Sequence, residues 1–244
     1  MKPLVFLDTE TTSLEEGRLV QLAMRRQDGS GIVDVFKPPV PIDYEAMAVH
    51  HITQAQADEN EPFGDQERTF IKKLIDGAVV VAHNAPFDLG VMEREGVVIP
   101  EWICSKKVAM RLWPDWPSHK LQYIRYRLGV EVKAGAAHDA LADVIVLEAV
   151  FERMLKEAWR HIDDDGDIIK FLQQVSREPS LLVAVTFGKH RGATWEAVAK
   201  ADRGYLDWIL SKGNDFDEDV RHTAGHWLNE TMPKPKPSPQ KTLL

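Results

Sequence analysis

Three strand-like segments joined by short turns fill the first 37 residues of the chain. Residues 3–9 form a short apolar run, and residues 18–26 alternate between the two faces of a strand. Residues 31–37 make a third segment, which Pro38 and Pro39 end because proline cannot continue a central strand. Three consecutive strands with short connections predict an antiparallel meander.

The pattern then changes to alternating helices and strands. Apolar side chains recur at helical spacing in residues 66–75, and residues 78–82 form a short buried strand. Helices are predicted over residues 86–95, 119–128 and 138–158. Three strands followed by alternating helices and strands favour an α/β fold with a mixed sheet.

An acidic segment with one glycine, residues 161–167, interrupts this pattern and is typical of a solvated linker. A calcium-binding EF-hand loop starting at Asp163 would need a glutamate at its twelfth position, where the chain has Gln174. Beyond the linker we expect a small α+β domain. Its predicted elements are a helix near 167–176, a strand at 182–187, and helices near 194–201, 204–212 and 217–230.

These segments predict three parts of the chain. Residues 1–160 form the first domain, residues 161–231 a small accessory domain, and residues 232–244 a flexible tail rich in proline. No internal repeat is found in the sequence.

Composition excludes several classes of protein. With 44% hydrophobic residues and a net charge of -8, the chain is not disordered by default. Cys104 is the only cysteine, which excludes a disulfide scaffold. No segment approaches the roughly 20 apolar residues of a membrane helix, and Asp8 interrupts any signal-peptide run. We expect a soluble, cytoplasmic protein with no membrane partner. Its acidity argues against broad electrostatic binding of duplex DNA, although clustered carboxylates could still hold metal ions.

The first candidate site is the acid pair Asp8 and Glu10, at the end of the apolar run. In a strand, residues i and i+2 share a face, so both carboxylates project the same way. Two acids at the end of a buried strand are unfavourable unless a cation neutralises them. The alternative is a surface acid pair that occurs by chance.

Two further acidic segments stand at predicted helix starts. Asn84 and Asp88 lie between a buried strand and a helix, where helix capping is the alternative to ligand binding. His138 precedes Asp139 and Asp143, which share a helix face at a spacing of i and i+4. Here too a helix cap and a structural histidine are the alternatives.

Taken together, the three segments resemble the DEDD superfamily of 3′→5′ exonucleases. Asp8 and Glu10 match its first motif, Asp88 its second, and His138 with Asp143 its third. A histidine before the last aspartate is typical of the DEDDh branch, which includes proofreading subunits of bacterial DNA polymerases. Five further segments resemble one group within that branch: residues 46–53, 102–104, 111–114, 187–192 and 204–208. Ser13 and His51 depart from the usual pattern, which bears on the fit of the substrate more than on catalysis.

The resemblance implies a ribonuclease H-like α/β fold and metal-dependent hydrolysis of DNA from the 3′ end. Carboxylate ligands select hard cations, so we expect two Mg²⁺ or Mn²⁺ ions. By the family pattern Asp8 bridges both ions, Glu10 and Asp143 hold the first, and Asp88 positions the second. His138 would accept a proton from the attacking water, which predicts activity that rises with pH through about 6.5.

Several substrate contacts are predicted near these acids. Thr11 and Thr12 could hold the terminal sugar, Leu14 could stack on the last base, and Asn84 could hydrogen-bond the strand. Each also has an ordinary packing role as its alternative.

In the second domain, Lys189 and Arg191 lie between two glycines and could contact phosphates. A hairpin turn with solvated charges is the alternative. The domain's aromatic residues fit a small core better than a base-stacking platform. They are Trp195, Tyr205, Trp208 and Trp227.

The last residues resemble short peptides by which bacterial DNA enzymes dock on the sliding clamp. Gln240, Leu243 and Leu244 would form the anchor, with a chance match as the alternative. For the whole chain two other functions stay open. One is a 3′-end exonuclease of RNA, since sequence does not reveal tolerance of the 2′-OH. The other is a non-catalytic module that binds nucleic acid or a protein partner.

Overall fold

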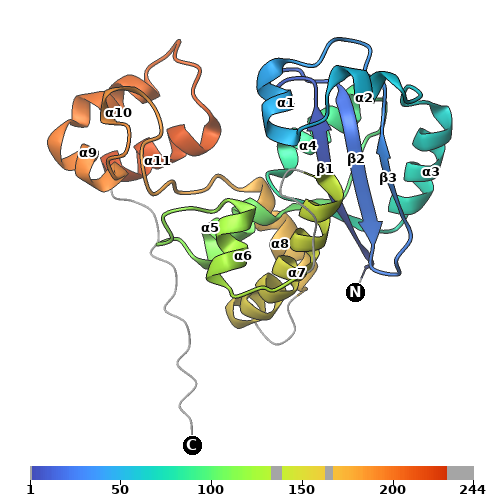
Figure 1. Ribbon diagram of the computed structural model, residues 1–244. Helices are drawn as coiled ribbons and strands as arrows, with labels where there is room; N and C mark the ends of the chain where they lie inside the picture. The colour runs from blue at the N-terminus through green and yellow to red at the C-terminus, as the bar shows by residue number, and fades with distance from the viewer. Residues whose placement is uncertain (1, 133–138, 163–166, 230–244) are drawn as a thin grey trace, which may run out of the picture.

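A computed structural model describes residues 2–132, 139–162 and 167–229 (Figure 1). Its central feature is a five-stranded sheet with the order β3-β2-β1-β4-β5. The strands are β1 (Leu4–Thr11), β2 (Leu19–Arg26), β3 (Gly31–Val35), β4 (Val79–Ala82) and β5 (Trp102–Cys104). β1 pairs antiparallel with β2 and parallel with β4, so it lies at the centre of the mixed sheet.

The antiparallel meander of the first three strands is confirmed. β2 pairs antiparallel with β3, and β4 pairs parallel with β5. In the β1–β2 ladder Asp8 lies opposite Ala23, and Glu10 lies opposite Gln21. The register shifts between Glu10 and Thr11, which ends the regular pairing just past the two acids.

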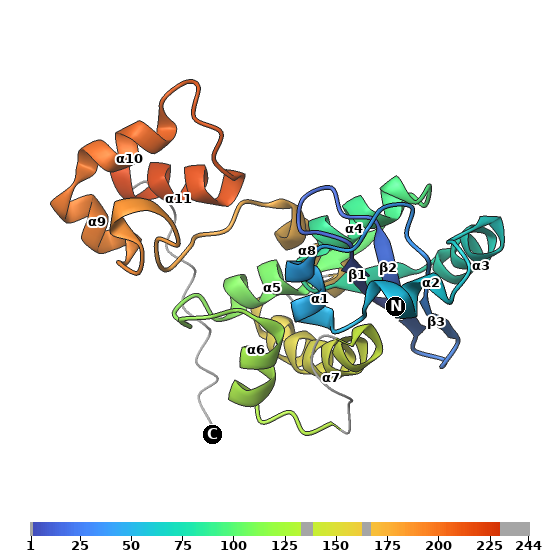
Figure 2. The ribbon, with the colours of Figure 1, turned by 45° about the horizontal axis from the view of Figure 1, so that its top comes forward.

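Each face of the sheet carries its own apolar core, which explains the continuous apolar run of β1. Leu4 and Phe6 face a core that includes residues of the long helix α7 (Ala140–Ala158). Val5 and Leu7 face the opposite core, together with residues of α3 (Asp65–Ile75) and α4 (Ala85–Arg94). The fold is therefore a sheet between two helical layers (Figures 1 and 2).

Three further helices join α7 on its side of the sheet. They are α5 (Ser105–Leu112), α6 (Leu121–Arg127) and α8 (Ile168–Arg177), and all three supply residues to the core there. α7 continues into a short 3₁₀ turn, Trp159–His161. α1 (Tyr44–His50) and α2 (Gln54–Asp58) cover β2 with a small separate cluster that includes Val20, Ile42 and Ala57.

The structure adds elements that the sequence reading did not predict. α1, α2, β5 and α5 lie in segments for which no helix or strand was expected. α2 and β5 have only five and three residues, too few for hydrophobic periodicity to indicate a type. β5 exists because β4 offers it a parallel partner, with Ile103 opposite Val81.

The C-terminal helical unit, residues 182–229, contains α9 (Trp195–Ala201), α10 (Arg203–Leu210) and α11 (Glu218–Asn229), with a 3₁₀ turn at Gly188–His190. The strand predicted over residues 182–187 is wrong. That segment forms one isolated bridge, between Ala184 and Thr194. Its β-prone residues have no partner strand in the described part of the chain and pack instead on the helices, as Val185 does. The small α+β domain is therefore a helical unit.

α8 belongs to the first core although it follows the acidic segment. Ile168, Ile169 and Leu172 are buried in the α7-side core, and the Cys104 amide of β5 donates to the Ser176 hydroxyl over 2.8 Å. The domain boundaries after residues 160 and 231 stay predictions, and the tail 232–244 lies outside the described residues. Among the described helices, none is long and apolar enough to cross a membrane.

Candidate active site

The two acids of β1 project toward the α7 side of the sheet. Asp8 and Glu10 continue the alternation of Leu4 and Phe6, which lie in the α7-side core. Thr9 points to the opposite side, where α4 begins. The end of β1 thus delivers two carboxylates to one face of the sheet and a threonine to the other.

Asp88 reaches the end of β1 from the first turn of α4. Its side chain is only 3% exposed. The amide and the hydroxyl of Thr9 both donate to Asp88 Oδ1, over 3.0 and 2.7 Å. Asn84 takes the N-cap position of α4 with a left-handed φ of 73°, but no side-chain capping bond forms there. Side-chain capping therefore does not account for Asn84.

Asp143 lies in the first turn of α7, and a glutamine of α6 holds it. Gln122 Nε2 donates to Asp143 Oδ1 over 2.8 Å. Arg125 Nη1 donates to Gln122 Oε1 over 3.3 Å, which fixes the direction of that amide. Asp143 is thus oriented through α6.

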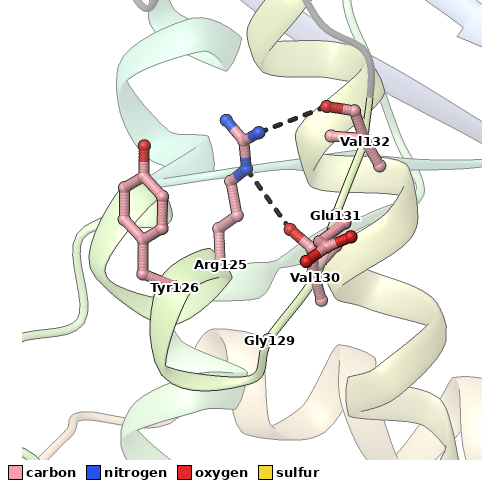
Figure 3. A pocket seen from close by; sticks show the side chains of 6 residues that line it. All are labelled: Arg125, Tyr126, Gly129, Val130, Glu131 and Val132. Atoms are coloured by element: carbon pink, nitrogen blue, oxygen red, sulfur yellow. Dashed lines mark hydrogen bonds between the residues drawn. The ribbon is translucent and has the colours of Figure 1, made fainter.

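Arg125 is itself held in place. Its Nε and Nη2 donate to the carbonyl oxygens of Val130 and Val132, over 3.4 and 3.2 Å (Figure 3). The same residues, with Tyr126, line a hollow of about 640 Å³ beside α6. Figure 3 shows the guanidinium reaching across to the segment that follows Gly129.

A second glutamine ties the start of α7 to the sheet. Gln21 Nε2 donates to Asp139 Oδ1 over 3.2 Å, and Gln21 Oε1 accepts the Ala140 amide over 3.1 Å. Because Gln21 lies opposite Glu10 in the β1–β2 ladder, this contact brings the helix start beside the acid pair. The sequence reading missed both glutamines. The only sequence signal for Gln21 was its polar side chain within the mostly apolar β2.

The acids from the three segments act on one another electrostatically. Burial and the negative charges of Asp88, Glu10 and Asp143 raise the pKa of Asp8 well above its ordinary value. Burial raises the pKa of Glu10 to about 8, and the charges of Asp143 and Asp88 add to that effect. Burial also raises the pKa of Asp88 to about 7, against the hydrogen bonds from Thr9, which lower it. Four acids from distant parts of the sequence therefore share one site.

This site suits a hard divalent cation. In the described part of the chain no ion pair involves Asp8, Glu10 or Asp88, so no cationic side chain within salt-bridge distance offsets their charge. Carboxylate oxygens without thiol or imidazole partners are the ligands of Mg²⁺ and Mn²⁺. Within those residues no three potential ligands yet converge as a preformed metal cage.

The loop after β1 presents Leu14 to solvent, with 83% of its surface exposed. The loop closes tightly because a Cβ on Gly17 would lie 2.1 Å from the Ser13 carbonyl oxygen, so only glycine fits. Arg18 anchors the loop end through Nε and Nη2 to the buried Glu95 carboxylate, over 2.8 and 3.0 Å.

Thr11 and Thr12 are both buried and make contacts within this loop. Thr11 Oγ1 donates to the Ser13 carbonyl over 2.8 Å, and Thr12 Oγ1 accepts the Arg18 amide over 3.0 Å. Both threonines therefore shape the loop next to the acids.

A buried histidine links the end of β4 to the segment before α6. His83 Nε2 lies 2.9 Å from the His119 carbonyl oxygen, and Nδ1 lies 2.9 Å from the Ser105 hydroxyl. Since a carbonyl only accepts, Nε2 carries the proton. Burial lowers the pKa of His83 to about 4, so the ring is neutral near pH 7. His83 therefore connects the end of β4 to the segment before α6 as a neutral ring.

Other predicted site residues lie apart from the acids or outside the described residues. Lys189 in the helical unit pairs with Asp202 over 2.7 Å, whereas no ion pair of the described residues includes Arg191. The predicted general base, His138, lies outside the described residues. The same holds for the predicted clamp-binding residues Gln240, Leu243 and Leu244.

Comparison with known proteins agrees with this geometry. Residues 5–151 match the RNase T family of exonucleases, a match that contains Asp8, Glu10, Asp88 and Asp143. The chain belongs to this exonuclease family.

Individual relatives extend the match over nearly the whole chain. Exodeoxyribonuclease 10 of Escherichia coli (strain K12) is 32% identical over 232 residues, covering 92% of this chain and 98% of the relative. The epsilon subunit of DNA polymerase III from Pasteurella multocida (strain Pm70) is 30% identical over 236 residues, covering 86% and 91%.

Among solved structures, exonuclease X in complex with 5′ overhanging duplex DNA superposes with a TM-score of 0.55. It is 24% identical and covers 71% of this chain and 99% of its own, a level of identity that supports the shared fold.

Proposed function

We propose that this chain is a metal-dependent 3′→5′ exodeoxyribonuclease that releases nucleoside 5′-monophosphates. The observation that carries the proposal is that Asp88 of α4 and Asp143 of α7 lie near enough to the two β1 acids to raise the pKa values of Asp8 and Glu10. Among the described residues no ion pair involves Asp8, Glu10 or Asp88. The substrate class comes from Exodeoxyribonuclease 10, the relative that aligns with 92% of this chain.

The four acids of the cluster would together hold two Mg²⁺ or Mn²⁺ ions. Glu10 and Asp143 would hold one ion and Asp88 the other, and Asp8 would contribute to both. When bound, such ions lower the pKa of the attacking water and stabilise the leaving 3′-oxygen. His138 accepts the proton of that water, for which it must be neutral, so the rate rises with pH through about 6.5.

The loop after β1 receives the end of the strand. Leu14 is exposed there and stacks on the last base, while Thr11 and Thr12 shape the place of the terminal sugar. Asn84 contacts the strand from the start of α4, where Lys106 Nζ donates to its Oδ1 over 3.3 Å. A solved relative is bound to duplex DNA with a 5′ overhang, which supports a recessed 3′ end as one substrate.

The helical unit and the tail have separate proposed roles. Arg191 contacts a phosphate of the substrate, and Lys189 does so only if it leaves Asp202. Gln240, Leu243 and Leu244 dock on the sliding clamp of the cytoplasmic replication machinery. A pull-down in which deletion of residues 240–244 leaves clamp binding unchanged would refute the role of the tail.

Digestion of matched 5′-labelled single-stranded DNA and RNA with Mg²⁺ tests the main proposal. The Asp143→Ala variant removes one metal ligand, and Glu152→Ala is its matched control, because Glu152 is an exposed acid on the same helix. We expect a shortening DNA ladder with the wild type and with Glu152→Ala, and none with Asp143→Ala.

Other outcomes would change the assignment. A ladder on RNA alone would keep the mechanism and replace the substrate. If neither strand shortens with Mg²⁺ or Mn²⁺ although the protein is folded, the chain is a binding module and the proposed activity is wrong.

A further inference from the structure

One stretch of this acidic chain is strongly basic. The whole chain has a net charge of -8, whereas residues 105–130 contain six basic residues and a single acid, Asp115. The stretch comprises α5, the loop that follows it, and α6 (green in Figures 1 and 2). The basic residues are Lys106, Lys107, Arg111, Lys120, Arg125 and Arg127.

Two of these cations are held by a carboxylate or by backbone carbonyls, whereas the other four have no carboxylate partner among the described residues. Lys107 pairs with Asp219 over 3.3 Å, and Arg125 donates to backbone carbonyls of the segment after α6. Within the described residues, none of the other four forms an ion pair. The four are Lys106, Arg111, Lys120 and Arg127.

Aromatic rings lie among these cations. Trp113 and Trp116 stack with their ring centroids 4.5 Å apart, and Tyr123 meets Trp116 edge-on at 6.2 Å. The Arg127 guanidinium lies 4.9 Å over the Trp116 ring and donates to the Tyr123 hydroxyl over 3.1 Å. The three rings are half-buried, and Trp113 and Trp116 also pack against the α7-side core, so part of each ring remains exposed on a fixed scaffold.

This surface borders the acid cluster. Gln122, the neighbour of Tyr123 on α6, donates to Asp143, and Lys106 of α5 donates to Asn84 beside α4. α5 and α6 pack against α7 on the same side of the sheet that Asp8 and Glu10 face (Figure 2). A polymer that enters the acid cluster can continue across the loop between α5 and α6.

We propose that this surface, the α5–α6 basic face, binds the single-stranded segment of DNA that leads to the 3′ end. The inference rests on the proposed exonuclease function and adds the path of the strand. Cations that track a phosphate backbone, combined with rings on which bases stack, are how proteins hold single strands regardless of sequence.

Binding of a labelled oligo(dT) to the non-hydrolysing Asp143→Ala protein tests the proposal. Lys120→Gln with Arg127→Gln removes two exposed cations, and Lys72→Gln with Lys73→Gln is the matched control on α3, on the other side of the sheet. Loss of two phosphate contacts should weaken affinity about tenfold or more at moderate salt and reduce the slope of log K against log salt by about 1.4. The control pair should change neither quantity.

Trp116→Ala supplies an independent variant. Loss of one stacking ring should weaken oligo(dT) binding about tenfold with an unchanged salt slope, because no charge is removed. Melting curves of every variant identify any that fails to fold, and the double glutamine variant alters exposed side chains only.

Hydrolysis of the p-nitrophenyl ester of thymidine 5′-monophosphate separates this proposal from the proposed function. The ester reaches the acid cluster without covering the α5–α6 basic face, so the double variant should lose far more activity on oligo(dT) than on the ester. If the wild type hydrolyses both substrates and the double variant binds oligo(dT) like the α3 control, the basic face is not the path of the strand. If the wild type hydrolyses neither, the proposed function itself fails. Tighter binding of oligo(U) than of oligo(dT) would overturn DNA as the occupant.

Discussion

In the sheet domain the pKa of Glu10 is raised to about 8, whereas in the helical unit the pKa of Asp202 is lowered to about 2. Glu10 is partly buried, and the negative charges of Asp143, Asp88 and Asp139 act on it. Asp202 accepts from Lys189 Nζ at 2.7 Å and from His190 Nε2 at 2.8 Å. The surroundings of Glu10 disfavour the charged form of its carboxyl group, whereas the surroundings of Asp202 favour it.

The difference separates a ligand-binding site from a structural contact. Like charges gathered in a partly buried place destabilise the folded protein, and an added cation removes that cost. An acid with its own cation needs no ligand, and here it also accepts the Tyr205 amide at the start of α10. These two environments therefore distinguish acids whose charge a bound cation would stabilise from an acid that already stabilises the fold through its own ion pair.

The largest expected effect comes from Glu10→Gln, which removes one charge of the cluster. Hydrolysis should fall at least about a thousandfold, since metal catalysis supplies several kcal/mol of transition-state stabilisation. The metal-free variant should nevertheless melt roughly 5 to 10 °C above the wild type at a pH above the raised pKa of about 8, because a repulsive charge is gone.

The contrast between Glu10 and Asp202 fails if Glu10→Gln does not both lose hydrolysis and gain melting temperature. Glu152→Gln, an exposed acid on α7, is the control and should change neither activity nor melting temperature. A metal-free Glu10→Gln protein that melts below the wild type would mean that Glu10 has a stabilising partner in the fold.

The second prediction concerns the stability of the metal-free protein as a function of pH. The pKa values of Glu10 and Asp88, about 8 and about 7 in the folded state, lie above their ordinary values of 4.5 and 3.8. The folded protein thus keeps protons that the unfolded chain releases. The contribution of these two groups to the free energy of unfolding is fully present below about pH 4. It is lost as the pH rises through 7 to 8, and the total loss is about a few kcal/mol.

Urea unfolding in EDTA across this pH range measures the decline. With saturating Mg²⁺ the decline should vanish, because the ion binds the ionised acids of the folded state and not the unfolded chain. A stability that stays level in EDTA between pH 4 and 8 would show that burial and neighbouring charges do not raise the pKa values of Glu10 and Asp88.

The acids of this cluster were predictable because each lies at a local signal. Asp8 and Glu10 end an apolar run, and Asp88 and Asp143 open helices, so local patterns assign each acid to its strand or helix. The mixed sheet was predictable for the same reason. Each of these patterns depends only on residues that are close together in the sequence. The resemblance to the DEDD superfamily is what joined the three segments into one predicted site.

The residues that hold the cluster together were not predictable in this way. Gln21 depends on the register of β1 with β2, and Gln122 on the packing of α6 against α7, neither of which has a local pattern. The false strand at residues 182–187 has the same cause, since β-prone residues form a strand only where a partner strand lies beside them.

The third prediction addresses one of these missed residues. Gln122→Leu keeps the bulk of the side chain and removes the donor to Asp143 Oδ1. Partners of this kind typically contribute 10- to 100-fold in metal affinity, so we expect roughly tenfold weaker Mn²⁺ binding by calorimetry and a matching loss of activity at low metal concentration. High metal concentration should restore most of the activity. Gln174→Leu, an exposed glutamine of α8, is the control, and equal Mn²⁺ affinity in both variants would exclude a role for Gln122.

The smallest expected effect lies in the helical unit, at Asp202. Its lowered pKa means that its contribution to stability is present above the ordinary value of 3.8 and is lost as the pH falls toward about 2. Because the pair with Lys189 is exposed, Asp202→Asn should lower the melting temperature by no more than a few degrees. The change should be absent in a comparison made near pH 2, and hydrolysis of a mononucleotide ester should not respond. Mg²⁺ should stabilise the variant and the wild type equally, because Asp202 is not one of the proposed metal ligands. A large loss of ester hydrolysis in the variant would instead mean that Asp202 takes part in catalysis, and the distinction between the two kinds of carboxylate would fail.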